Sequence, residues 1–290
     1  MRAAVIDANG HILSRARIAT EPERGLIDAT KRLATLLRDV AAAVGQRPIE
    51  AVGIATAGPV DPVTGTYRHP PNLSGWHGLS MVPGLSKALG LPVVVGHDAT
   101  VAALAETRFG ARRGADDLIY LTLSTGIGAG IVSGGRSITG STGGAGEAGH
   151  VIVRPGGPSC GAGCRGCLEG VASGSAMARA AQEGLAAGRA SSLVPGTDAA
   201  GVFAAAAAGD ALATEIIDGA SRASRQGWRG CWLCSTRRRS FWAAGWSASW
   251  RHAGMSCSSG RATLRCRGTR VACRSSGPRS GTTPASSAHR

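Results

Sequence analysis

The chain has 290 residues, 43% of them apolar, so it is long enough to fold around a sizeable core. It contains no run of 18 apolar residues and no signal-peptide pattern at its start, so we expect a cytoplasmic protein without a membrane span. The net charge of +14 is typical of nucleic-acid-binding proteins, but it is concentrated after residue 221, where 14 of the 32 basic residues and none of the 18 acidic ones lie. The charges of residues 1–220 balance, so a nucleic-acid partner is not expected for this part.

The predicted elements begin with a β-hairpin, in which residues 3–7 and 12–18 are joined by Ala8-Asn9-Gly10. Apolar residues at helical spacing predict an amphipathic helix over residues 23–44, and a second helix is predicted over residues 99–108. Short strands are predicted at four further places: 51–56, 92–95, 118–123 and 128–132. A Gly/Cys-rich loop and alanine-rich helices follow to about residue 224. Strands that alternate with helices indicate an α/β fold.

The composition changes after residue 225. Residues 226–290 contain no Asp, Glu, Lys, Asn or Ile, but they hold five of the eight cysteines and five of the six tryptophans. Folded domains have more aliphatic and acidic residues, and disordered tails have less Trp and Cys. A GC-rich gene read out of frame gives this composition, so we expect a frameshift near residue 225 and a non-native or disordered tail. A genuine tail that binds RNA through arginine and stacked aromatics is the alternative.

Two groups of residues could act on a substrate. Asp98 follows His97 at the junction of a predicted strand and a predicted helix. It either caps the helix, or it is a general base aimed at a substrate hydroxyl from the carboxyl end of the strand. Glu147 and His150, with Glu169 further on, could converge on a sugar, because carboxylates and imidazole both hydrogen-bond hydroxyl groups. An unrelated surface role is the alternative for this second group.

Two further motifs could bind a metal or a phosphate. One histidine and three cysteines within 18 residues form a plausible Cys₃His zinc set, with unrelated free thiols as the alternative: His150, Cys160, Cys164 and Cys167. Glycines in the segment 124–130, between two predicted strands, would let backbone N–H groups approach a phosphate. A hairpin turn without a ligand is the alternative for that segment.

In their order and spacing these motifs resemble the ROK family of bacterial sugar kinases and sugar-responsive repressors, from about residue 3 to residue 224. The matching segments are Gly58-Pro59-Val60-Asp61, Pro71-Asn72-Leu73-Ser74-Gly75-Trp76, His97-Asp98, Thr125-Gly126-Ile127-Gly128, Glu147-Ala148-Gly149-His150 and Gly166-Cys167-Leu168-Glu169. The resemblance implies an α/β, actin-like (ribonuclease-H-like) fold of two lobes, which we place at residues 1–110 and 111–225. It also implies a hexose bound between the lobes, with ATP as phosphoryl donor.

The resemblance also implies a role for each matching residue. Asp98 would take the proton from the attacking sugar hydroxyl, and Mg²⁺ would neutralise the charge that develops on the phosphates. The residues that would bind the sugar are Asn72, His97, Glu147, His150 and Glu169. The residues that would face the nucleotide phosphates are Thr125, Gly126 and Gly128. His150 would also belong to the zinc set and so orient the sugar through the metal. Kinases of this family are often dimers or tetramers, so the resemblance implies a homo-oligomer for the intact family, and the sequence itself does not indicate the oligomeric state of this chain.

Four departures from the family pattern affect this expectation. The family's Asp-x-Gly-Gly-Thr phosphate hairpin would fall before Met1, and its late nucleotide-binding glycine turn is not found after residue 225. The middle thiol of the zinc loop stands at Cys164 rather than at the position of Ala162, and His97 stands where asparagine is common. We therefore expect an incomplete second lobe and a crippled, glucokinase-like kinase of a hexose or N-acetylhexosamine. The alternative is a sugar-sensing regulator of the same family that lacks its DNA-binding module.

Overall fold

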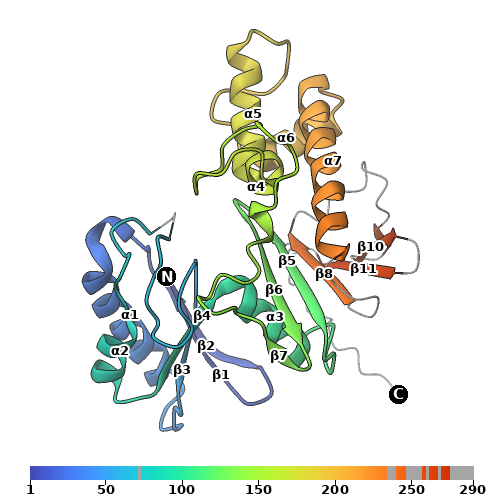
Figure 1. The fold of residues 1–290 in the computed structure, drawn as a ribbon. Coiled ribbons are helices and arrows are strands. Elements are labelled where there is room, and N and C mark those ends of the chain that lie inside the picture. The colour runs from blue at the N-terminus through green and yellow to red at the C-terminus, as the bar shows by residue number, and fades with distance from the viewer. Residues whose placement is uncertain (71–72, 234–239, 246–256, 259–260, 267–268, 275–290) are drawn as a thin grey trace, which may run out of the picture.

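The computed structural model describes residues 1–70, 73–233, 240–245, 257–258, 261–266 and 269–274 (Figure 1). It begins with the expected hairpin, in which β1 (Arg2–Ile6) pairs antiparallel with β2 (Ile12–Arg17). The Gly10 N–H donates to the Asp7 carbonyl at 2.9 Å, and Gly10 has a φ of 85°. A turn closed in this way, with a left-handed residue at its end, is one of the common three-residue hairpin loops.

The rest of the N-terminal lobe packs on one long helix. The helix α1 (Gly25–Ala42) follows a short 3-10 turn (Pro22–Arg24), which confirms the helix predicted over residues 23–44. Its apolar face packs with β1 and with α2 (Val82–Leu89) in one core cluster that includes Leu26, Ala29, Leu33, Leu36, Val40, Tyr67, Trp76 and Leu85. The strands β3 (Val52–Thr56) and β4 (Val93–His97) form a separate parallel pair. This lobe therefore contains two two-stranded sheets that share a core.

The helix α3 (Asp98–Arg108) joins this lobe to the next (Figure 1). It starts at the residue after β4 and packs on β5 (Leu118–Leu123) and β6 (Ile127–Ser133), which pair antiparallel. A Cβ atom at Gly130 of β6 would overlap the carbonyl oxygen of Ala99. Only glycine permits so close an approach of a strand to a helix backbone. The small residues of β6 thus fix the start of α3 against the sheet.

The second lobe is built on a seven-stranded sheet with the order β7-β6-β5-β8-β11-β10-β9. Its remaining strands are β7 (Arg136–Ser137), β8 (Ser240–Gly245), β9 (Cys257–Ser258), β10 (Arg261–Cys266) and β11 (Thr269–Arg274). The strand β8 runs parallel to β5, and β11 runs parallel to β8. Side-chain periodicity did not predict these tail strands. Their pairing uses backbone N–H and C=O groups, which do not depend on an alternating sequence.

The other residues between 234 and 290 lie outside the described residues, so the expectation of a non-native tail stays a prediction.

Four helices pack beside the sheet: α4 (Leu168–Ala172), α5 (Gly174–Ala186), α6 (Ala199–Ala207) and α7 (Ala211–Leu233). They share a core that includes Leu168, Met177, Val202, Leu212 and Ile217. Within the described part of the chain no single helix is long and apolar enough to cross a membrane; α6 with residues 211–227 of α7 qualifies only as a pair bent by 115°.

Asp210, just before α7, ties this helical layer together. Its carboxylate accepts the N–H groups of Ala213 at 2.9 Å and Ser192 at 2.6 Å, and the hydroxyls of Ser191 and Ser192 at 2.9 and 3.0 Å. The backbone bonds from Ala213 and Ser192 hold the pKa of Asp210 well below its ordinary value of 3.8. The bonds favour the ionised form, so their stabilisation is fully present above that value and is lost as the pH falls through the lowered pKa.

We expect Asp210→Ala to lower the Tm by roughly 4 °C at pH 7, because a helix cap and the anchor of the 191–192 turn are lost together. The difference from the parent chain should shrink as the pH falls below about 4. Asp198→Ala is the matched control, because Asp198 caps α6 through one bond, from the Gly201 N–H. Thermal melts between pH 3 and pH 8 measure both variants. If both variants lower the Tm equally, or if the Tm difference of Asp210→Ala does not change with pH, this role of Asp210 is contradicted.

Candidate active site and metal centre

The candidate site residues gather around the first residues of β6. On one side, the Ile127 N–H donates to Glu169 Oε2 at 2.8 Å. The Glu147–His150 motif packs here through its glycines: a Cβ atom at Gly149 would overlap the carbonyl oxygen of Ile127. The Ala129 N–H donates to the carbonyl of Gly146, the residue before the motif, at 2.8 Å. Glycine at position 149 is therefore required for the motif to lie directly on the strand.

On another side of the same strand lie His97 and Asp98. A Cβ atom at Gly128 would be 3.7 Å from His97 Cε1, and one at Gly58 would be 2.7 Å from His97 Cδ2. The imidazole is thus held between β6 and the segment after β3, and its side chain is only 14% exposed. The Asp98 side chain is 57% exposed and lies 3.3 Å from His97, from Oδ1 to Nε2.

Asp98 matches both interpretations of the sequence. It is the first residue of α3, and its Oδ1 accepts the Ala99 N–H at 2.7 Å, so it serves the helix N-terminus. It also stands at the carboxyl end of the parallel pair β3–β4, where open α/β sheets bind ligands. An exposed carboxylate at that place is accessible to a substrate hydroxyl.

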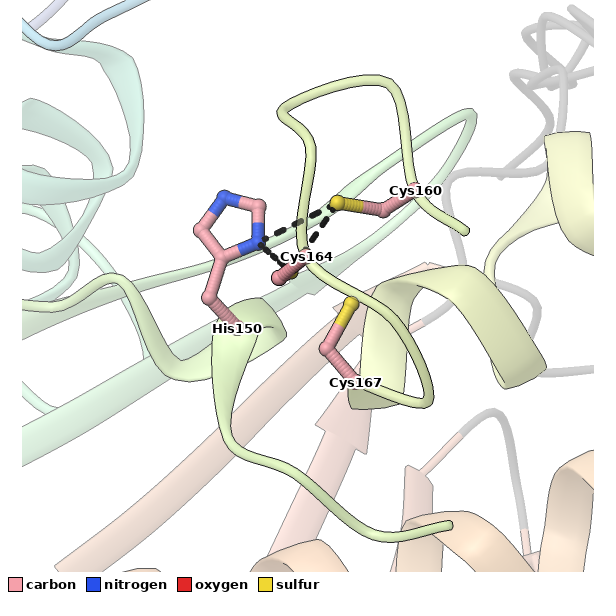
Figure 2. Close-up of side chains that lie close together, drawn as sticks. All are labelled: His150, Cys160, Cys164 and Cys167. Carbon is pink, nitrogen blue, oxygen red and sulfur yellow. Dashed lines mark hydrogen bonds between the residues drawn. The ribbon is translucent and has the colours of Figure 1, made fainter. Parts of the chain in front are cut away.

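His150 links the acidic group to the thiols. It ends a 3-10 turn (Ala148–His150), and its Nε2 lies 3.7 Å from Glu147 Oε2. Its Nδ1 faces the other way, 3.4 Å from the Cys164 sulfur and 3.7 Å from the Cys160 sulfur (Figure 2). The two ring nitrogens therefore have different partners, and an ion bound at Nδ1 would fix the direction of Nε2.

The predicted metal ligands come together in one cluster, in which the ligand atoms of His150, Cys160, Cys164 and Cys167 all lie within 4.8 Å of one another (Figure 2). A tetrahedral zinc ion with these ligands needs S···S separations of about 3.8 Å and S···N separations of about 3.5 Å. The two S···N distances meet this requirement, whereas the Cys160 and Cys164 sulfurs, 3.1 Å apart, would have to separate slightly. The residues present thus fit zinc, and the shifted Cys164 does not break up the set.

Local backbone pairing explains why these ligands meet. Residues 151–154 pair with 166–168: the Leu168 N–H donates to the Val151 carbonyl, and the Val153 N–H to that of Gly166, both at 2.9 Å. This pairing places Cys167 opposite Ile152, two residues after His150. The loop between them turns back on itself, because the Cys160 N–H donates to the Cys164 carbonyl at 3.0 Å.

The electrostatics of the cluster also favour a cation. Burial and the neighbouring thiols of Cys160 and Cys167 raise the pKa of Cys164 to about 12. Burial also raises the pKa of Cys167. For Cys160 the hydrogen bonds from Cys164 and from the Ala162 N–H outweigh the effect of burial and lower the pKa to about 7. Cys160 is therefore the thiol that ionises most readily, and ionising all three thiols near neutral pH requires a positive charge among them.

Two predicted site elements remain. Asn72 lies outside the described residues, and the structure places the aromatic residues on either side of it, Tyr67 and Trp76. The Tyr67 and Trp76 rings pack edge to face 5.2 Å apart, and the Tyr67 hydroxyl lies 3.0 Å from Thr56 Oγ1. The other element, the Thr125–Gly128 turn, is closed by the Ser124 N–H, which donates to the Gly126 carbonyl at 2.9 Å.

Sequence reasoning missed the groups that hold this turn. The Gly174 N–H donates to the Ser124 carbonyl at 2.8 Å, and the Ser175 N–H to the Thr125 carbonyl at 3.2 Å. Both donors belong to the first turn of α5, whose N-cap is Ser173. A serine before an alanine-rich helix is a recognisable start signal, so the helix end could have been found. Its contact with the turn could not, because nothing in the sequence relates the two segments.

Comparison with known protein families matches the ROK family over residues 1–225. The chain belongs to the ROK family. The match ends at the residue where the composition changes. ROK relatives include the glucokinase of Thermotoga maritima, 39% identical over 180 residues, and the N-acetylmannosamine kinase of Citrobacter koseri, 37% identical over 217 residues. The first alignment covers 62% of this chain and 56% of the relative, and the second covers 75% and 70%. This chain thus spans little more than half the length of the first relative.

Solved ROK structures have the same fold. A ROK family glucokinase from Streptomyces griseus, solved in complex with glucose and AMPPNP, superposes with a TM-score of 0.72 at 31% identity, covering 94% of this chain and 90% of the other. A ROK family transcriptional regulator, a homolog of the E. coli MLC protein, has a TM-score of 0.73 at 28% identity, covering 84% and 62%. These similarities confirm the predicted α/β, actin-like fold.

Proposed function

We propose that this chain is a ROK-type, glucokinase-like sugar kinase, whose site binds a hexose or N-acetylhexosamine and uses ATP as phosphoryl donor. The observation that carries the proposal is the grouping around the start of β6, which is contacted by His97 and Ala99 on either side of the exposed Asp98, by Gly149 of the Glu147–His150 motif, and by Glu169. The glycine turn leads directly into the same strand. A sugar kinase needs these three parts: a base for the attacking hydroxyl, polar groups that hold the ring, and backbone N–H groups for the phosphates.

In this proposal each residue has a separate task. Asp98 accepts the proton of the attacking hydroxyl, while Asn72, His97, Glu147, His150 and Glu169 bind the sugar. Thr125, Gly126 and Gly128 face the phosphates of ATP. Mg²⁺, when bound to the nucleotide, would neutralise the charge on the transferred group. Zn²⁺, when bound by His150, Cys160, Cys164 and Cys167, would orient the His150 ring toward the sugar.

We expect turnover in this chain to be slow. Catalysis of phosphoryl transfer consists almost entirely of positioning and charge stabilisation. Residues 226–290 do not resemble the family's nucleotide-binding end, and the family match stops at residue 225. Sugar binding depends on fewer of these parts. We propose that it is kept, in a cytoplasmic and homo-oligomeric protein.

The proposal is tested by sugar binding. We expect isothermal titration to show saturable binding of glucose, N-acetylglucosamine or N-acetylmannosamine, with a Kd in the range from about 1 μM to 1 mM that is common for enzyme substrates. Glu147→Ala should weaken it by roughly 10- to 100-fold, because a charge-assisted bond to a hydroxyl is lost. Glu183→Ala is the control, since Glu183 lies on the exposed face of α5. Binding of none of the three sugars would refute the proposal.

A sugar-sensing regulator is the second candidate, and the likeness to the MLC homolog supports it. In that case the same site would bind sugar without transferring phosphate, and the chain would have to bind DNA without the helix-turn-helix module of the family's regulators. A gel-shift assay at physiological salt separates the two. Retention of operator-like DNA that sugar reverses would favour the regulator, whereas sugar phosphate formed from γ-labelled ATP would favour the kinase.

A further inference from the structure

The Thr125–Gly128 turn is held by residues that follow the metal ligand Cys167 directly. Glu169 Oε2 accepts the Ile127 N–H at 2.8 Å. The first turn of α5 adds the two bonds from Gly174 and Ser175 to the carbonyls of Ser124 and Thr125. Three hydrogen bonds onto one short turn therefore come from a segment of seven residues, 169–175.

That segment is rigidly connected to the metal cluster. Cys167 is the N-cap of α4, and its sulfur accepts the Gly170 N–H at 3.3 Å. Cys167 and Leu168 are fully buried, and the single turn of α4 ends where the Ser173 N–H donates to the Glu169 carbonyl at 3.1 Å. Only Leu168 lies between Cys167 and Glu169 in the chain, so a shift of Cys167 on metal binding is passed directly to the first turn of α4, which carries Glu169.

The carboxylate also lies closely against the turn. A Cβ atom at Gly126 would be 2.6 Å from Glu169 Oε2, and one at Gly149 would be 3.3 Å from Glu169 Cβ. Glu169 is thus enclosed by the glycine turn on one side and the Glu147–His150 motif on the other. It cannot be displaced while the turn keeps its conformation, because packed groups of this kind move together.

We propose that Glu169 is a positioning residue that couples the metal cluster to the glycine turn, so that zinc binding at Cys167 orders the turn and raises its affinity for a nucleotide triphosphate. The inference rests on the proposed function for the identity of the ligand, but not for the coupling itself. Coupling between two sites is reciprocal, so the nucleotide must raise the affinity for zinc by the same factor.

The experiment compares the zinc-loaded and chelated chain by two measurements. Titration with AMPPNP should show a Kd roughly tenfold lower with zinc, within the usual range of coupling between sites. Hydrogen exchange at the Ile127 amide should be at least tenfold slower with zinc, without any nucleotide present. Glu169→Ala removes the acceptor and should abolish both differences. Glu169→Gln keeps an acceptor oxygen, so it should restore most of the effect of zinc on AMPPNP affinity and on Ile127 exchange. Glu183→Ala on α5 should leave both effects of zinc unchanged.

The outcomes distinguish the coupling from the kinase assignment. If AMPPNP binds equally well with and without zinc, and Ile127 exchange is unchanged, the coupling is refuted and the kinase assignment stands. If AMPPNP never binds but Ile127 exchange still depends on zinc and Glu169, the coupling stands and the nucleotide assignment fails. A chain that takes up no zinc also refutes the coupling. Should the chelated chain unfold, the zinc-loaded variants decide: Ile127 exchange that is equal in Glu169→Ala and Glu169→Gln contradicts the proposal.

Discussion

Replacing Cys167 with alanine is expected to reduce bound zinc from about one ion per chain to almost none and to lower the Tm by more than about 10 °C. Cys167 is a fully buried member of the metal cluster and also caps α4. Structural zinc sites contribute on the order of 10 kcal/mol or more to folding, and each kcal/mol shifts the Tm of a domain of this size by about 2–4 °C. Losing one of four ligands should therefore have a larger effect than other single substitutions in this lobe.

Metal analysis of the purified chain and a thermal melt measure this effect. Met177→Ala is the control for lost packing, because Met177 is also buried in this lobe but is not one of the four candidate ligands. The double variant Cys164→Ala with Ala162→Cys returns the middle thiol to the family's usual position, and it should also bind zinc. If the purified parent chain contains no zinc, or if the Cys167→Ala chain still binds one ion, the cysteines are better interpreted as free thiols.

The second large effect is expected at Asp98. Asp98→Asn should lower phosphoryl transfer from γ-labelled ATP by roughly 10²- to 10⁴-fold, the usual contribution of a general base. Sugar affinity should change by only a few fold, because asparagine keeps the shape of the side chain and its bond to the Ala99 N–H. A long incubation at high chain concentration makes the slow turnover of the parent measurable.

Glu147→Ala serves as the comparison, because it should affect sugar binding more strongly than phosphoryl transfer. It should weaken sugar binding, and at saturating sugar it should lower transfer much less than Asp98→Asn does. An Asp98→Asn chain that transfers phosphate at the parent's rate would restrict Asp98 to capping α3. Loss of sugar binding in that variant would make Asp98 a binding residue instead of a base.

Much of the first lobe could be predicted from local sequence. The Ala8-Asn9-Gly10 turn and the apolar spacing of α1 each depend on neighbouring residues, which a sequence displays directly. The metal set could also be predicted, since one histidine and three cysteines within 18 residues leave few other arrangements. The family resemblance added the fold of the whole, because it relates segments that spacing alone cannot connect.

The unpredicted features all depend on contacts between distant segments. Glu169 and Ile127 are 42 residues apart, and no periodicity indicates that one accepts a hydrogen bond from the other. The strands β8 and β11 join the sheet through backbone groups, so their side-chain sequence carries no strand pattern. The contact of Gly130 with Ala99 shows up in the sequence only as one glycine among 44.

The division of the first lobe into two separate strand pairs has a consequence for handling the protein. Within the described residues β1 pairs only with β2 and β3 only with β4, so each of these strands has one edge without a strand partner. Isolated two-stranded sheets are marginally stable, and strand edges without a partner can form hydrogen bonds with strands of other molecules. Exposed isoleucines at positions 6 and 12 flank the first pair. Self-association at high concentration should therefore begin at the strand edges of this lobe and not at the thiols of the second lobe.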